Sequence, residues 1–288
     1  MTNPTTPLLS AEPISAERMK AAILKLKDLP AAAPVVHKAL VQLEDPDFAV
    51  AELKKVLLSD QAVAARILRL ANSAYFGFRS EVQTVSQAVV LLGQSRIRTL
   101  LHRLLVDRLL TELGHGESAG IRRRSLATAT ASALLSQLLV VQDAEEMLLA
   151  GLLHNIGELF CYARFPAHYE QVREGQDPRA LFPLSWWQAG KLLLESWQFP
   201  PLYPTVVEYC EDPLSPSCPE PHQTAVRLVH AGKKLAEGFI GGKQPAGILA
   251  GIAEPIRELC HLDEDLISEV FATLPQRMSL EQLQAGRR

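Results

Sequence analysis

The sequence predicts an all-α protein built from many helices. Apolar residues recur at helical spacing along most of the chain, and the segments they form begin at residues that favour helix starts. We find no run of alternating β-branched residues long enough to be a strand. Hydrophobic residues make up 48% of the 288 residues, which is enough to bury a substantial core. We therefore expect helices packed on helices.

The first half of the fold is expected over residues 15–113. Residues 1–14 precede it; they are rich in threonine and proline, show no periodicity and are predicted to form a loose tail. An N-cap side chain accepts hydrogen bonds from unpaired N–H groups of the first turn, and proline suits the first helical position. On this basis four helices are predicted to begin at or near Ser15, Pro34, Asp47 and Asp60.

Two more helices complete this half. Thr84 and Gln87 have the spacing of a capping box, and the helix that they open is expected to stop at Gly93. A long amphipathic helix then runs to Gly114. Its basic residues point in several directions, which is typical of a solvated helix rather than of a stripe that binds nucleic acid. These residues are Arg96, Arg98, Arg103 and Arg108, with His102 among them.

A second half is predicted over residues 118–240, after the glycine-rich stretch "GHGESAG". One helix is expected from near Ile121. Another is expected to run without a break from Asp143, with Glu146 in capping-box order, to Phe165. Ser185 and Gln188 again have this order at the start of a later helix. Further helices are predicted over about 222–236 and 264–273, the second of them in a C-terminal helical extension, 241–288.

Composition and charge exclude several classes of protein. A net charge of −3 argues against a surface built for phosphate backbones, so a nucleic-acid partner is not expected. The four cysteines form no CxxC pair and are interpreted as reduced thiols. The N-terminus lacks the pattern of a signal peptide, and no apolar run approaches the roughly 20 residues of a membrane span. We expect a cytoplasmic protein that does not enter a membrane.

Several segments, taken in order, resemble the HD-related output domain, or HDOD. The first is "LPAAAPVVHKALVQLEDPDFAVAELKKVLLSDQAVAARILRLANSAYFG", followed by "AVVLLGQSRIRTL", "RRRSLATATASALL", "AGLLHNIGEL", "QAGKLLLESWQFP" and "VRLVHAGKKLA". The resemblance runs from about residue 20 to about residue 236. It implies an all-helical fold whose second half descends from the HD phosphohydrolases. It also implies a regulatory role in bacterial signalling, with response regulators, sensor kinases or cyclic-dinucleotide turnover proteins as partners.

The stretch "LANSAYFG" carries the signature of this family in Asn72, Ser73, Tyr75, Phe76 and Gly77. One interpretation is a turn that faces a partner. The interpretation we favour is a helix end, in which Asn72 and Ser73 bond to the local backbone, the two aromatic rings pack back and Gly77 takes the turn.

The resemblance also implies where an HD enzyme would hold its metal. Those enzymes bind one or two divalent cations through histidines and aspartates from separate helices. The matching positions here are Arg124, His154 with Asn155, Trp186, Cys210 with Glu211, and Lys233. Only His154 keeps a ligand type, and the two cationic residues would repel a metal. We therefore predict no metal, no cofactor and no catalytic residue.

Two questions stay open at this level. His154 could donate a hydrogen bond to Asn155 or to Glu158, which lies at i+4, or it could belong to a residual metal-dependent phosphohydrolase. Arg124 and Lys233 could pair with Glu158 and Glu211, point to solvent, or hold the phosphates of a cyclic dinucleotide. The preferred reading is a non-catalytic module that works by binding proteins, with a nucleotide ligand as an alternative.

Overall fold

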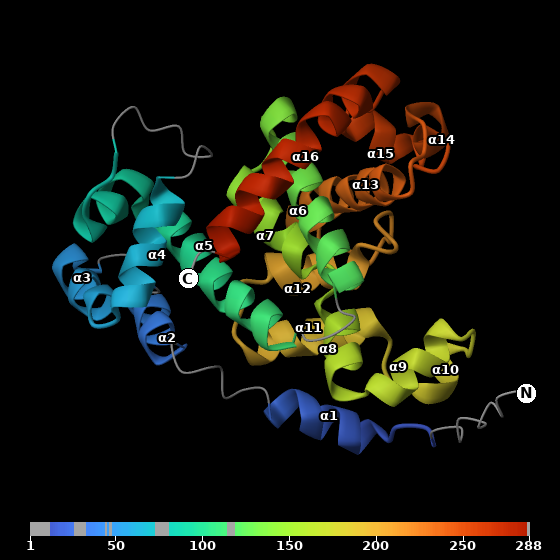
Figure 1. Cartoon of the computed structure of the whole chain (residues 1–288), viewed down its shortest axis with the longest axis horizontal. Coiled ribbons are helices and arrows are strands. Elements are labelled where there is room, and N and C mark those ends of the chain that lie inside the picture. Colours follow the sequence, from blue (N-terminus) through green and yellow to red (C-terminus); the bar gives the residue numbers. More distant parts are fainter. Residues whose placement is uncertain are drawn as a thin grey trace, which may run out of the picture.

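Helices and the turns between them make up the regular structure of the computed structural model (Figure 1). The structure describes residues 12–25, 33–43, 45, 48–72, 81–113 and 119–286. Within these ranges there is no β-strand, so the predicted all-α class is confirmed. None of the helices found there has both the length and the apolarity of a membrane span.

The first core is formed by four helices on the left of Figure 1. They are α2 (Ala33–Gln42), α3 (Val50–Leu58), α4 (Gln61–Ala71) and α5 (Val85–Leu113). Asp60 caps α4 as predicted, accepting hydrogen bonds from the N–H groups of Ala62 and Val63. The N-cap position of α3 is Ala49, and the predicted cap Asp47 lies outside the described residues.

Helix α5 contains a break where the sequence predicted a stop. Its capping box is present, because the Gln87 side chain accepts from the Thr84 N–H and Thr84 Oγ1 accepts from the Gln87 N–H. Gly93 then adopts φ +74° and ψ 175°, a conformation outside the helical region. A side chain with a Cβ is strained at such a positive φ, so glycine suits this kink.

The prediction that α5 is solvated along its basic residues is wrong at its centre. His102 and Arg103 are each only 4% exposed. His102 packs against the ring of Phe199 with centroids 4.7 Å apart, and Arg103 forms an ion pair with Glu145. The physical reason is that α5 lies between two cores and is covered on both sides, whereas Arg96, nearer the kink, is about half exposed. The side chain of Arg108 lies outside the described part.

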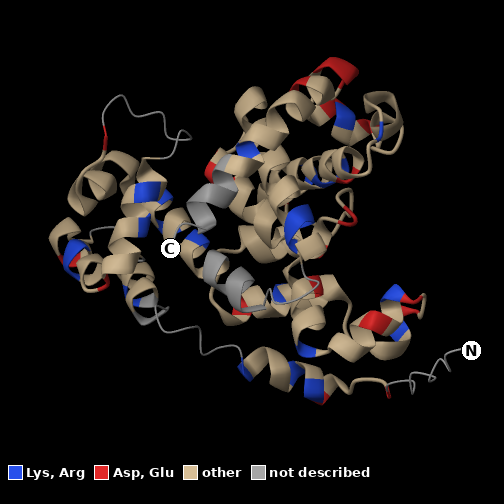
Figure 2. Cartoon of the chain, viewed as in Figure 1, with Lys and Arg blue, Asp and Glu red and all other residues tan. Residues whose placement is uncertain are grey.

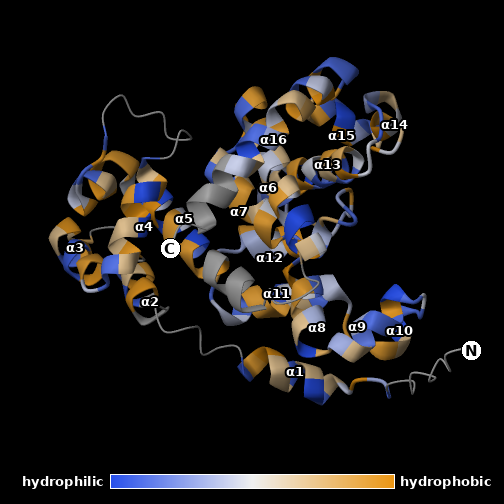
Figure 3. Cartoon of the chain, viewed as in Figure 1, coloured by the Kyte–Doolittle hydropathy of each residue, from blue (hydrophilic) through white to orange (hydrophobic). Residues whose placement is uncertain are grey.

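The second and larger core is arranged around α6, which packs along α7 and α13 (Figure 1). Its other helices surround these three, and Figure 3 shows that most of them have apolar turns on one side and polar turns on the other, the pattern expected of helices with one buried face. The elements are α6 (Ala119–Leu139), α7 (Ala144–Leu153), α8 (Ile156–Arg164), α9 (Pro166–Arg173), α10 (Pro178–Leu181), α11 (Trp186–Ser196), α12 (Leu202–Tyr209), the 3₁₀ turn η2 (Glu220–His222) and α13 (Gln223–Ile240).

The continuous helix predicted from Asp143 to Phe165 is interrupted, which corrects the sequence interpretation. Asp143 does cap α7, but α7 ends at Leu153 with His154 as its C-cap, and α8 begins after Asn155. Beyond the break, Gly157 lets α8 approach α11 very closely. A Cβ on Gly157 would lie 1.8 Å from the carbonyl oxygen of Trp186, so no other residue fits without moving one of the helices. His154 and Asn155 therefore lie in a corner between helices.

Elements from both ends of the chain also pack on the second core. Met19 and Ile23 of α1 (Ala16–Lys25) are buried there, and the Ile14 N–H donates to the Leu181 carbonyl over 2.9 Å. Ser15 caps α1, as predicted, through the Arg18 N–H. The boundaries at 15–113 and 118–240 stay predictions, but α1 precedes the first core in sequence and packs with the second.

The predicted C-terminal extension adds three helices to this core. They are α14 (Pro245–Leu249), α15 (Glu254–Leu259) and α16 (Glu264–Gly286). The last of these, α16, is long and contacts α6. Ile256, Ile267 and Leu274 are fully buried among the residues of the second core. Among the residues that are coloured in Figure 2, Lys and Arg occur on many helices and do not gather on one element.

Candidate functional site

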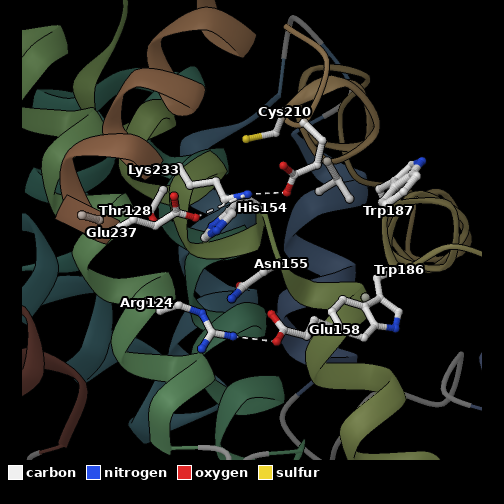
Figure 4. Close-up of a pocket in the computed structure, with 14 residues that line it drawn as sticks. Arg124, Thr128, His154, Asn155, Glu158, Trp186, Trp187, Cys210, Lys233 and Glu237 are labelled. Carbon is white, nitrogen blue, oxygen red and sulfur yellow. Dashed lines mark hydrogen bonds and ion pairs between the residues drawn. The ribbon is translucent and has the colours of Figure 1, made fainter. Parts of the chain in front are cut away.

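A cavity of about 330 Å³ opens between α6, the α7–α8 corner, α11, α12 and α13. All the pocket residues named from the sequence border it, although they come from five parts of the chain. They are Arg124, His154, Asn155, Glu158, Trp186, Cys210, Glu211 and Lys233. Figure 4 shows two charged groups, Arg124 with Glu158 at one end and Lys233 with Glu237 at the other. Glu211 belongs to the second group through its ion pair with Lys233.

Six further lining residues were not named as pocket residues from the sequence, and three of them, Thr128, Trp187 and Glu237, have polar or aromatic side chains. Thr128 and Glu237 lie four residues after Arg124 and Lys233 on the same helices, and Trp187 follows Trp186 at the start of α11. The i,i+4 spacing would have identified Thr128 and Glu237, because such residues share a helix face. Trp187 is 42% exposed, which is high for a tryptophan, and lines the pocket together with Trp186.

The first charged group is a carboxylate held by two donors. Arg124 Nη2 lies 2.6 Å from Glu158 Oε1, and the Tyr169 hydroxyl donates to the same oxygen over 2.7 Å. Trp186 stacks on the Tyr169 ring with centroids 5.6 Å apart. Burial, together with the neighbouring Glu158 charge, raises the pKa of Tyr169 well above its ordinary value. The predicted pairing of Arg124 with Glu158 is confirmed.

The second charged group surrounds an ammonium. Lys233 hydrogen-bonds Glu211 and lies 3.7 Å from Glu237, so its predicted pairing with Glu211 is also confirmed. Burial alone would raise the pKa of Glu211, but the hydrogen bond and charge of Lys233 outweigh burial and lower it. Burial likewise opposes the charge of Lys233, yet Glu211 keeps the Lys233 pKa above its ordinary value. Both groups are therefore ionised at neutral pH.

His154 is bound to its own helix, which differs from the prediction. Its Nδ1 donates to the carbonyl of Gly151 over 2.6 Å, rather than to Asn155 or Glu158. His154 comes directly after the last turn of α7, where the final carbonyls have no partner within the helix. Its ring turns back and binds one of these carbonyls. Burial lowers the pKa of His154 to about 4, and the charges of Lys233 and Arg124 add to the effect. The imidazole is neutral at physiological pH.

Asn155 uses its carboxamide to join α8 to α6. Its Oδ1 accepts from the Ser125 hydroxyl over 2.6 Å, and its Nδ2 donates to the Ile121 carbonyl over 3.4 Å. An aspartate could accept the first bond but could not donate the second. The amide at this position therefore has a structural use, in place of a metal ligand.

The family signature lies elsewhere, at the end of α4. Asn72 donates to the carbonyls of Leu68 and Val82 and accepts from the Val82 N–H, at 2.7–2.9 Å. The predicted bonding of Asn72 to the backbone is confirmed, and it links α4 to the approach to α5. Ser73, Tyr75, Phe76 and Gly77 lie outside the described residues.

The pocket does not suit a divalent metal ion. Within the described residues, no three His, Cys, Asp or Glu side chains are grouped as a metal site would require. Burial raises the pKa of Cys210 to about 12, so its thiol stays protonated and is a poor ligand. The carboxylates of Glu158 and Glu211 are already bound to cations. A metal ion would have to displace both cations before it could bind these carboxylates.

Comparisons with known proteins agree with the fold. The family model described as the HDOD domain matches residues 29–213. A protein from Shewanella amazonensis SB2B, assigned in name only as a phosphohydrolase, has a structure with a TM-score of 0.67; the match is 24% identical and covers 92% of this chain and 98% of that one. An HDOD domain protein of unknown function from Geobacter sulfurreducens also gives 0.67, at 18% identity, with 94% and 99% covered.

A curated sequence gives a more distant match. An uncharacterized protein of Treponema pallidum (strain Nichols) is 22% identical over 234 residues, which is 77% of this chain. The chain spans 44% of the length of that relative. At these identities the solved structures bear on the fold alone.

Proposed function

The chain belongs to the HDOD domain family, and from this premise we propose that it is a non-catalytic regulatory module of bacterial signal transduction that binds other signalling proteins in the cytoplasm. The expected partner is a response regulator, a sensor kinase or a cyclic-dinucleotide turnover protein. The proposal does not require a cofactor.

One observation carries this proposal: each cation in the pocket is bound to a carboxylate. Arg124 binds Glu158, and Lys233 binds Glu211. By the family resemblance, Arg124 and Lys233 occupy positions where HD enzymes have metal ligands. Metal-dependent hydrolysis needs a cation that acidifies a water molecule, and the ligands of that cation must be free to bind it. Here the carboxylates are committed and the neighbouring charges are positive, so the pocket favours a regulatory use.

The direct test is affinity capture with the full chain as bait. Trp187 is the exposed aromatic residue at the pocket, and aromatic side chains of this kind often anchor protein interfaces. We expect a signalling protein to be retained by the wild type and by Leu214→Ser, which alters an exposed leucine that does not line the pocket. If repeated capture experiments retain no signalling protein, the proposal is contradicted.

Two alternative activities have their own tests. Near-stoichiometric Mn, Fe, Ni or Zn in protein purified without chelator, or phosphodiester turnover that His154→Ala abolishes, would show a residual phosphohydrolase.

The second alternative is a sensor that binds a cyclic dinucleotide, and calorimetry with such nucleotides tests it. One observation favours this alternative: Arg124 and Lys233 border the same cavity. Binding that the Arg124→Ala/Lys233→Ala variant loses would replace the protein-binding proposal with a nucleotide-binding one.

A further inference from the structure

The side chain of Thr128 is buried in the wall of the pocket, and its hydrogen-bonding capacity is unused. Three other hydroxyls of α6, those of Ser125, Thr130 and Ser132, each donate to the backbone carbonyl four residues earlier. Thr128 is only 1% exposed and lines the cavity, yet its hydroxyl has no hydrogen-bond partner among the described residues. A buried hydroxyl without a partner is costly, so this group points to a ligand that supplies one.

A second unpaired group lies on the neighbouring helix. His154 Nδ1 donates to the Gly151 carbonyl, so Nε2 carries a lone pair, and no donor to it is found in the described part of the chain. The two helices meet closely here, because a Cβ on Gly151 would lie 3.1 Å from the carbonyl carbon of Thr128. Thr128 and His154 both line the cavity, and Figure 4 shows them at the end that holds Lys233.

The charges around these two groups do not favour an anionic ligand. Arg124 and Lys233 are each bound to a carboxylate. Glu211 and Glu237 line the same cavity with side chains 54% and 43% exposed, so a ligand that carried a phosphate would meet their negative charge. The capacity that remains unused is uncharged: one nitrogen that accepts, and one hydroxyl that donates or accepts.

An aromatic surface completes the site. Trp187 lines the cavity and is 42% exposed, so its ring is available to a flat ligand, and Trp186 and Val207 also border the space. Heterocyclic rings stack favourably on aromatic side chains. The cavity volume of about 330 Å³ is at the lower end of the roughly 300–1,000 Å³ of ligand pockets, which suits a small ring system.

We propose that the pocket binds an uncharged, planar heterocycle with an N–H donor beside a carbonyl, as in the hypoxanthine and uracil rings. The N–H donates to His154 Nε2, the carbonyl accepts from the Thr128 hydroxyl, and the ring lies on Trp187. Recognition then depends on the base, which distinguishes this ligand from a cyclic dinucleotide held by its phosphates on Arg124 and Lys233. The inference goes beyond the protein-binding role and does not depend on it.

The test is isothermal titration calorimetry of the full chain with inosine and with uridine, which both carry the required ring edge. The controls are N1-methylinosine and N3-methyluridine, in which a methyl group replaces the hydrogen of the N–H. We expect saturable binding of at least one nucleoside, and binding of its methylated form that is weaker by about tenfold or more, because His154 Nε2 is left unpaired. Inosine monophosphate should bind no more tightly than inosine.

Two matched variants of α6 assign the binding to one hydroxyl. Thr128→Val keeps the shape of the side chain and removes the unpaired hydroxyl, so it should weaken binding about tenfold without lowering Tm. Thr130→Val is the control, because the Thr130 hydroxyl is already bound to the Leu126 carbonyl and the residue does not line the cavity. It should leave the affinity unchanged.

Several results would overturn the inference. One is the absence of binding of either nucleoside at millimolar concentration, and another is equal affinity for the methylated forms. An unchanged affinity of Thr128→Val, or a Tm below that of the wild type, would show that its hydroxyl is not an unused ligand group. Much tighter binding of inosine monophosphate would assign recognition to the cations. None of these results bears on the capture of a signalling protein, so the protein-binding proposal is tested separately.

Discussion

Two ionic regions of the protein, one at the junction between the cores and one in the pocket, differ in how much water reaches them. At the junction between the cores, Arg103 of α5 and Glu145 of α7 lie 2.9 Å apart, with side chains 5% and 2% exposed. In the pocket, Arg124 and Glu158 lie 2.6 Å apart, with side chains 40% and 13% exposed. The chemistry and the distances are nearly the same, so burial makes the difference.

Burial changes what each pair can do. A buried ion pair has lost the hydration of both charges, so removing one partner leaves an uncompensated charge in an apolar surrounding. A pair that keeps access to water loses much less, because solvent replaces the missing partner. We infer that the junction fixes how the two cores meet, while the pocket pairs can exchange partners at low cost. A site at which a regulatory partner binds needs charges that can exchange partners at low cost.

The largest expected effect is at the junction. Arg103→Met should lower the free energy of unfolding by about 3–5 kcal/mol, because Glu145 would keep a buried charge. Glu145→Gln should cost a similar amount. Chemical denaturation followed by far-UV circular dichroism measures both. The double variant Arg103→Met/Glu145→Met should be more stable than either single variant, and a double variant that loses the sum of the two would show that the groups act separately.

The next effect concerns the wall of the pocket. We expect added side-chain volume there to destabilise the protein more than the loss of a pocket charge does. Gly157→Ala places a Cβ 1.8 Å from the Trp186 carbonyl oxygen and 2.7 Å from the Gly190 nitrogen, and backbone atoms cannot rotate away. We expect a loss of about 3 kcal/mol, at the upper end for overpacking. Gly247→Ala is the control, because its Cβ would meet nothing within 4 Å. Equal melting temperatures for the two variants would rule out a tight α8–α11 contact.

A third prediction uses the histidine at the junction. Burial, and then the charge of Arg98, lowers the pKa of His102 to about 3, against roughly 6.5 in the unfolded chain. Between these values the unfolded state takes up a proton that the folded state does not, so stability falls as pH decreases. The slope is about 1.4 kcal/mol per pH unit for one proton. His102→Phe should lessen the slope by this amount between pH 6 and pH 4, measured by urea unfolding at several pH values. An unchanged slope would mean that His102 is solvated.

A contrast between local and long-range contacts explains which features could be predicted from the sequence. Helix starts were predictable because caps act locally: Ser15, Asp60 and Asp143 each bond to N–H groups within three residues. The residues around the pocket were predictable only through the family resemblance, which supplied the long-range pairing of helices. The buried state of Arg103 was not predictable, since a basic residue on an amphipathic helix has the same periodicity whether water or a second core covers it.

The break between α7 and α8 shows the other limit of sequence reasoning. Leu, Ile and Glu around "HNIGEL" favour a helix, and no proline interrupts it. The chain turns here because the Asn155 amide bonds to α6 and Gly157 fits against the backbone of α11. Both contacts depend on helices far away in the sequence, so tertiary packing overrides local propensity.

The smallest expected effect is in the pocket and completes the comparison. Arg124→Gln should lower the free energy of unfolding by less than about 1 kcal/mol, because the arginine side chain is 40% exposed and Glu158 keeps the hydroxyl of Tyr169 as a donor. The measurement is the same denaturation experiment used for Arg103→Met, at the same pH and salt. A loss as large as that at the junction would mean that the pocket pair is as structural as the buried one. A small loss, with Arg103→Met strongly destabilised, would show that the pocket can rearrange its charges without unfolding.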